Sequence, residues 1–170
     1  CVTVCELGKY RSSYIGCEYW TVDLDQYADP FTNPMPNEVP HAVVISNPND
    51  KDATVSFRAM SAGVSVSVPD PVVPAHSSKS FEMPRLDVSG TGITDRAIRI
   101  ASTIPVVAHQ FNPLNDEGVF SNDASLLLPS NTVGEEYFVI NWPSQIIPCI
   151  FMPCPEPQLS YVTIVATRMG

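Results

Sequence analysis

The sequence predicts an all-β fold, an antiparallel β-sandwich of jelly-roll or immunoglobulin-like type with long proline-rich loops. Apolar and polar residues alternate along most of the chain, as they do in strands with one buried face. The 17 prolines, in turn clusters such as NPND and VPDPVVP, mark many chain reversals and disfavour long helices. Spacings of roughly 8 to 15 residues between turn signals suit an antiparallel sandwich better than a βαβ fold.

Two kinds of strand are expected along the chain. Alternating segments, which predict half-buried strands, lie at 53–59, 64–68, 78–83 and 97–102. More continuously apolar segments, which predict central strands, lie at 41–47, 106–111, 125–129, 136–142 and 161–167. Short helical turns are expected near 130–135. Two proline-rich stretches, 27–40 and 143–158, are expected to be long loops, which are usually functional or disordered.

The charge balance excludes one class of partner. Charged residues make up 16% of the chain, and 18 acidic residues against 9 basic ones give a net charge of −9. Such a surface repels a phosphate backbone, so nucleic acid is not an expected partner. No apolar run approaches the roughly 18 residues of a membrane span. The expected partners are other extracellular proteins or copies of the chain itself, for the reasons given by the cysteines and the family resemblance below.

The five cysteines point to an exported protein with disulfides. Cys5 and Cys17 bracket a short polar segment, and Cys149 and Cys154 lie close together in a proline-rich loop, so two local bridges are expected. A zinc site is disfavoured, because the chain has neither a CxxC pair nor a nearby pair of histidines. Cys1 is left over. It is expected to bond to another chain or, alternatively, to carry the lipid of a processed bacterial lipoprotein.

Oxygen ligands suited to calcium occur in two places. They are Asp23 and Asp25 on one face of an expected strand, and Asn47, Asn49, Asp50 and Asp52 in one turn. Neither set has DxDxDG spacing with a closing Glu, and Asp and Asn favour turns for conformational reasons. No metal or other cofactor is expected, and calcium at Asp23, Asp25, Asn49 and Asp50 is kept as an alternative.

Catalytic motifs are absent from the sequence. It has no GxSxG elbow, no glycine-rich phosphate loop and no metal-binding spacing among its three histidines. We therefore expect no enzymatic activity. A hydrolase would need Asp23, Asp25, His109 and nearby serines to converge in a pocket.

Three aromatic residues, Tyr19, Trp20 and Trp142, lie near the ends of expected strands. Aromatic residues on strands more often pack in a core or an interface than bind ligands. An alternative function is nevertheless a carbohydrate-binding module that uses these three rings as a stacking platform.

Five blocks, in this order, resemble the N-terminal domain of immunoglobulin-Fc-binding proteins. They are GCEYWTVDLDQY, HAVVISNPNDKDATVSF, VSVSVPDPVVPAHSSKSFEMP, GITDRAIRIASTIPVVAHQFNP and LLLPSNTVGEEYFVINWPS, within residues 16 to 167. The family also occurs in large secreted and surface proteins of bacteria, often after cysteine-rich segments. The resemblance implies an all-β, extracellular, adhesive or structural module. It carries over no catalytic residue and no Fc contact, and the loop at 143–158 departs from the family in its length and cysteines.

The predicted organisation follows from the blocks. Residues 1–15 are expected to be the tail of a preceding cysteine-rich segment, and 16–170 to be the β-sandwich domain, continuing beyond Gly170. The expected function is a non-enzymatic structural or adhesive module, extracellular or at the cell surface, that acts through protein contact. Assembly with neighbouring subunits is expected to use an open sheet edge that accepts a strand.

Overall fold

The computed structural model describes residues 4–8, 13–26, 39–114, 123–144 and 159–167. They belong to two units, one formed by 1–133 with 167–170 and the other by 134–166. We call the described part of the first unit the sandwich. The arm denotes residues 134–144 and 159–166. Among the described residues, no helix is long and apolar enough to cross a membrane.

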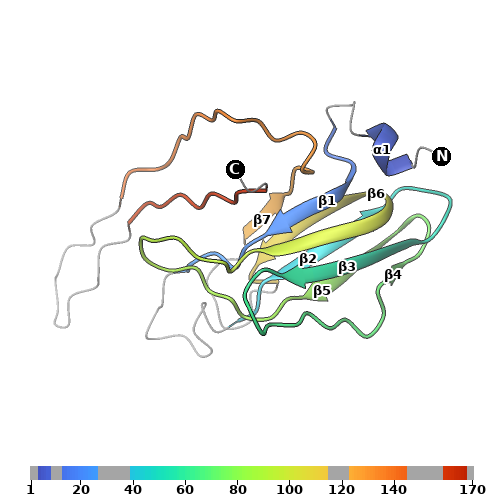
Figure 1. Cartoon of the computed structure of the whole chain (residues 1–170), viewed down its shortest axis with the longest axis horizontal. Coiled ribbons are helices and arrows are strands. Elements are labelled where there is room, and N and C mark those ends of the chain that lie inside the picture. The colour runs from blue at the N-terminus through green and yellow to red at the C-terminus, as the bar shows by residue number, and fades with distance from the viewer. Residues whose placement is uncertain (1–3, 9–12, 27–38, 115–122, 145–158, 168–170) are drawn as a thin grey trace. The chain divides into compact units, whose positions relative to one another are not determined.

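The described part of the sandwich consists of one short helix and seven strands (Figure 1). They are α1 (Val4–Gly8), β1 (Gly16–Thr21), β2 (Ala42–Asn47), β3 (Ala53–Ala59), β4 (Val72–Val73), β5 (Ser77–Glu82), β6 (Ile98–Asn112) and β7 (Asp123–Leu126). Every ladder between these strands is antiparallel. The prediction of an all-β, antiparallel, sandwich-like fold is therefore confirmed.

Strand β6 organises the sheet, because its 15 residues pair with four other strands. Its first half pairs with β1 and β3, and its second half pairs with β2 and β7. Strand β4 extends the sheet beyond β3, and β5 extends it beyond β2. The two halves of β6 thus belong to different parts of one sheet that folds around a common core.

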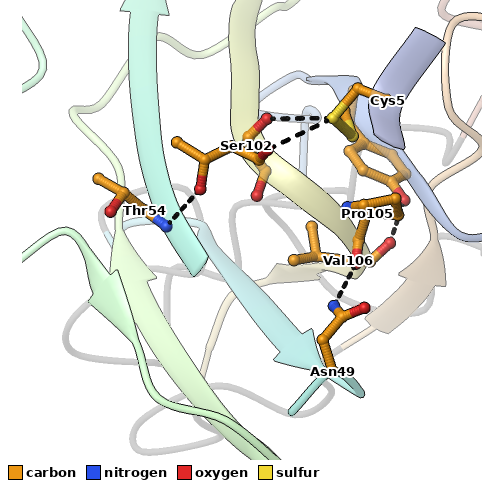
Figure 2. Close-up of a disulfide and its surroundings, with 9 residues drawn as sticks. Cys5, Asn49, Thr54, Ser102, Pro105 and Val106 are labelled. Atoms are coloured by element: carbon orange, nitrogen blue, oxygen red, sulfur yellow. Dashed lines mark hydrogen bonds between the residues drawn. A yellow bond between two sulfur atoms is a disulfide. The ribbon is translucent and has the colours of Figure 1, made fainter. Parts of the chain in front are cut away.

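The sheet bends where β6 passes from its first set of partners to its second. Proline supplies no N–H to a ladder, and Pro105 lies in this stretch of β6. The pairing with β1 shifts register here, between Gly16 and Glu18. Figure 2 shows the contacts made with this stretch: the Sγ of Cys5 lies beside the carbonyl oxygens of Ser102 and Thr103, and the amide of Asn49 donates to the carbonyl oxygen of Pro105. The backbone N–H of Thr54 donates to the Oγ1 of Thr103.

Asparagines hold the neighbouring corner between β2 and β3. The buried amide of Asn47 donates to the carbonyl oxygens of Lys51 at 2.8 Å and Val73 at 3.0 Å. The amide of Asn49 donates to the Oδ1 of Asn47 at 2.8 Å and to the carbonyl oxygen of Pro105 at 2.7 Å. These bonds give partners to carbonyl groups of the turn after β2, of β4 and of the bend in β6, where an unpaired buried polar group would be costly.

The core lies on the inward face of these strands. Its buried side chains are Tyr19, Val43, Ile45, Ala53, Val55, Ala59, Val73, Phe81, Met83, Ile98, Ile100, Val106 and Ala108. Alternate residues of β3 and β6 point inward, as the alternating sequence predicted. The rings of Phe57 and Phe81 pack with their centroids 5.1 Å apart.

Several predicted strands differ in the structure. Segments 97–102 and 106–111, which were predicted to be two strands, form one bent strand, β6. Segment 64–68 contains no strand. Its valines still pack against the core, so its alternating pattern reflects one-sided burial without backbone pairing. Helix α1 and the two-residue β4 were not predicted, because both are too short to carry a periodic signal.

The two last predicted strands, 136–142 and 161–167, are not strands in the structure. The first lies in the arm, and so does the second as far as residue 166. Both carry the continuous apolar sequence of a central strand, but no ladder among the described residues includes them. Sequence pattern alone therefore did not decide strand formation, which also needs a paired neighbour.

Candidate interaction surfaces

One of the two expected disulfides is present among the described residues. Cys5, in α1, is bonded to Cys17, in β1, with the two Cα atoms 5.7 Å apart. The Sγ of Cys5 also lies 3.6 Å from the carbonyl oxygen of Thr103, so the bridge fixes α1 beside the bend of β6 (Figure 2). Residues Cys1, Cys149 and Cys154 lie outside the described residues, and their pairing stays a prediction.

A buried polar cluster follows β1. The Nδ1 of His41 lies 3.6 Å from the Oδ1 of Asp23, and both side chains are almost completely buried. The backbone N–H of Leu86 donates to the Oδ2 of Asp23 at 3.0 Å. Burial works to raise the pKa of Asp23, but His41 and the Leu86 amide outweigh it and hold that pKa below its usual value. Burial and the neighbouring Asp23 carboxylate raise the pKa of Asp87, against the opposing effect of Arg85.

The sequence did not predict this cluster, because His41, Asp23 and Asp87 are distant along the chain and match no motif. It differs from the hydrolase set. In the ladder His109 lies opposite Val44 and Leu126, whereas Asp23 faces His41. The structure therefore does not bring Asp23 and His109 together as a catalytic pair.

The calcium candidates in the turn after β2 make hydrogen bonds within the protein. Asn49 donates to Asn47 and Pro105, and the Oδ1 of Asp50 lies 2.8 Å from the Nε2 of His76. Within the described ranges no three His, Cys, Asp or Glu side chains are grouped to hold a metal, and this includes Asp23 and the half-buried Asp25. Calcium at Asp23, Asp25, Asn49 and Asp50 stays a prediction.

The three aromatic candidates are placed differently. Tyr19 is completely buried, and its hydroxyl donates to the carbonyl oxygen of Val106 and lies 3.0 Å from that of Tyr14, so its ring offers no stacking surface. Trp20 is half-buried on β1, with an indole N–H that has no hydrogen-bond partner among the described residues. Trp142 is 87% exposed and lies in the arm.

Most edges of the sandwich are blocked. The backbone N–H of Ser130 donates at 2.9 Å to the carbonyl oxygen of Glu18, so chain already covers the outer edge of β1 there. Pro129 lies so close to Gly16 that a Cβ on Gly16 would clash with it. Strand β4 has two residues. Beside β5, the ammonium group of Lys79 donates to Asp70, and a charged side chain at an edge discourages a further strand.

The β7 edge, which we define as Asp123–Leu126 with the following Leu128, is different. One side of β7 pairs with β6, and no described strand pairs with the other. All four strand residues are exposed, and Leu126 and Leu128 are 45% and 55% exposed. Leu127, between them, packs against the core. An edge with exposed leucines and a single carboxylate lacks the usual protection against strand addition.

The arm is the second unprotected feature. Its exposed large apolar side chains are Tyr137, Phe138, Val139, Ile140, Trp142, Leu159, Tyr161, Val162 and Ile164. Its two runs lie beside each other at one end, where the amide of Asn141 donates to the carbonyl oxygen of Tyr161 at 2.7 Å. The backbone N–H of Ser160 also donates to the Oγ of Ser144 at 3.1 Å. The described residues of the arm form no β-ladder.

Sequence reasoning identified the arm as strand-like but missed the β7 edge. The segment 125–129 was expected to be a central strand because three leucines follow one another. Pairing on one side only makes β7 an edge strand instead. Leucines in a row give no signal that separates an edge from the middle of a sheet.

Comparisons with known proteins supply no relative. No protein-family model, curated protein or solved structure matches the chain.

Proposed function

We propose that this chain is a non-enzymatic, extracellular or cell-surface structural or adhesive module that acts through protein contact. The observation that carries the proposal is the arm. Nine large apolar side chains, half to fully exposed, are gathered in the described residues of the arm, 134–144 and 159–166. Exposed apolar surface of this extent is rare on a soluble monomer and typically marks a protein contact.

The disulfide supports the proposed location outside the cell or at its surface. The Cys5–Cys17 bridge closes a short loop beside β6, and such structural bridges persist in oxidising surroundings outside the cytosol. The resemblance of the sequence to the immunoglobulin-Fc-binding family supports the same compartment and an adhesive role. The absence of any recognisable catalytic motif supports a binding role over an enzymatic one.

Binding to immobilised proteins tests the proposal. The labelled chain would be applied to a panel of extracellular-matrix and cell-surface proteins, with immobilised copies of the chain included. We expect binding that is lost in Ile140→Lys and kept in Ile93→Lys, because the two isoleucines are similarly exposed but only the first lies in the arm. Binding that is as strong with Ile140→Lys as with the wild type would contradict the proposal.

A glycan array separates the competing function. A carbohydrate-binding module would give array signals that disappear in Trp142→Ala, since Trp142 is the most exposed of the three candidate rings. The protein-contact proposal expects a blank array. Array binding together with an unreactive protein panel would favour the carbohydrate alternative.

A further inference from the structure

We propose that the partner of the arm is a second copy of this chain, and that the arm of one copy adds to the β7 edge of the other. This proposal rests on the proposed function and names the partner of its contact surface. The proposed contact joins the arm to the β7 edge, and each copy of the chain has both.

The arm has the side-chain pattern of internal strands. Successive residues of an extended chain point to opposite faces. Phe138 and Ile140, on one face, are 103% and 96% exposed, while Tyr137 and Val139, on the other, are 65% and 58% exposed. A segment that is apolar on both faces is typical of a strand covered on both sides. A neighbouring strand would pair with the backbone of the arm, and a covering layer would bury its apolar side chains. A second sandwich offers both.

The β7 edge has the features that accept a strand. No described strand pairs with its outer side. By contrast, the segment at Ser130 covers the edge of β1, and the charged Lys79 lies at the edge of β5. Leu126 and Leu128, two residues apart, point to the same outward face and offer an apolar surface to the added strand. Strand addition of this kind obtains affinity from main-chain hydrogen bonds and specificity from alternate side chains.

The apolar area is sufficient for a stable contact. Tyr137, Phe138, Trp142 and Tyr161 are 65%, 103%, 87% and 50% exposed. Aromatic side chains bury about 150 to 250 Å² each. With the aliphatic residues of the arm, the available area reaches the roughly 800 Å² per partner of a standard protein interface.

The charge distribution favours a copy of the chain meeting at these surfaces. Two molecules with a net charge of −9 repel each other over most of their surfaces. The described arm beyond Glu136 carries no charge, and the β7 edge carries only Asp123. Contact at these two surfaces therefore brings few like charges together. It also predicts that dimerisation strengthens as salt screens the remaining repulsion.

Two matched pairs of variants test the proposal by sedimentation of the full chain, after free thiols are alkylated. We expect a wild-type dimer whose Kd rises about tenfold or more in Ile140→Lys and in Leu126→Lys, because each places a charge in the contact. The controls are Ile93→Lys and Met60→Lys. Their side chains are 104% and 44% exposed, close to the 96% of Ile140 and 45% of Leu126, and they should leave the Kd unchanged.

Mixing the two defective variants gives the sharpest result. Ile140→Lys keeps an intact β7 edge and Leu126→Lys keeps an intact arm, so the mixture should form a heterodimer that neither forms alone. If Leu126→Lys dimerises normally and mixing restores nothing, the arms pair with each other and the proposal is wrong.

A monomeric wild type also overturns the proposal, and hydrogen exchange then decides the proposed function. Rapid exchange in the arm of the monomer would leave protein contact with a different partner. Slow exchange in the arm of the monomer would mean that the chain covers its own arm. The proposed function would then lose the observation that carries it.

Discussion

Strand β2 and the arm contain nearly the same kind of sequence but differ completely in burial. The segment HAVVISN contains β2, in which Val43 and Ile45 are fully buried. The segment EYFVINW, in the arm, exposes Phe138 and Ile140 almost completely. The difference is the neighbours, because β2 pairs with β5 on one side and β6 on the other. An apolar strand sequence thus indicates a segment that needs paired neighbours, which β2 has and which no described ladder gives to the arm.

The largest expected difference is between two isoleucines. Ile45→Ala removes a fully buried side chain from the core and should lower the free energy of unfolding by about 2 to 5 kcal/mol. Ile140→Ala removes a 96% exposed side chain and should change it by less than about 0.5 kcal/mol in dilute monomer. Urea unfolding measures both. A large loss from Ile140→Ala in the monomer would show that the arm is already buried.

The disulfide gives the next effect. Replacing Cys5 and Cys17 together with serine should lower the free energy of unfolding by about 2 to 3 kcal/mol, because the bridge closes a loop of 12 residues in the unfolded chain. Thermal unfolding, compared with a reduced wild type, checks the value. A negligible loss would mean that α1 contributes nothing to holding the bend of β6.

Two asparagines provide a smaller comparison of the same kind. Asn47→Ala removes the amide that donates to the carbonyl oxygen of Lys51 and, in a buried bond, to that of Val73, and it should cost about 1 to 3 kcal/mol in urea unfolding. Asn141→Ala removes an exposed bond to Tyr161 in the arm and should cost less than about 0.5 kcal/mol. Equal losses would contradict the assignment of Asn47 as the clamp of the corner.

The smallest effect is the acid sensitivity of the sandwich. The pKa of Asp23 is lower in the folded chain than in the unfolded one, so its ionised form stabilises the fold above about pH 4. That stability is lost as the pH falls through the lowered pKa. The raised pKa of Asp87 acts in the opposite sense, because its stabilising contribution is present at low pH and is lost as the pH rises through that pKa.

Urea midpoints of wild type and Asp23→Asn between pH 7 and pH 3 separate these contributions. We expect the variant to be less stable at pH 7 and to lose less stability on acidification. Parallel curves for the two proteins would show that Asp23 is not the group responsible.

The sequence was sufficient to predict the features that depend on local pattern. Alternation placed β3 and β5 within a residue or two, and turn residues indicated the antiparallel class. The pairing of Cys5 with Cys17 was expected because the two are close along the chain. These features depend on neighbours in sequence, which periodicity and spacing report directly.

The remainder depends on contacts between distant segments. The Asp23–His41 pair, the blocked edge of β1 and the open edge of β7 arise from chain topology, which no local window encodes. The bend of β6 is a similar case. The sequence predicted two strands, at 97–102 and 106–111, but one strand continues through Pro105, held by hydrogen bonds from Asn49 and Thr54.

Concentration-dependent hydrogen exchange tests the central claim most directly. The claim is that the arm consists of strands that become paired only against a second molecule. In dilute monomer we predict that the amides of 137–142 exchange nearly as fast as an unstructured chain, while those of β2 are protected. At high concentration the amides of the arm and of β7 should become protected together. Protection of 137–142 equal to that of β2 in dilute monomer would contradict the account.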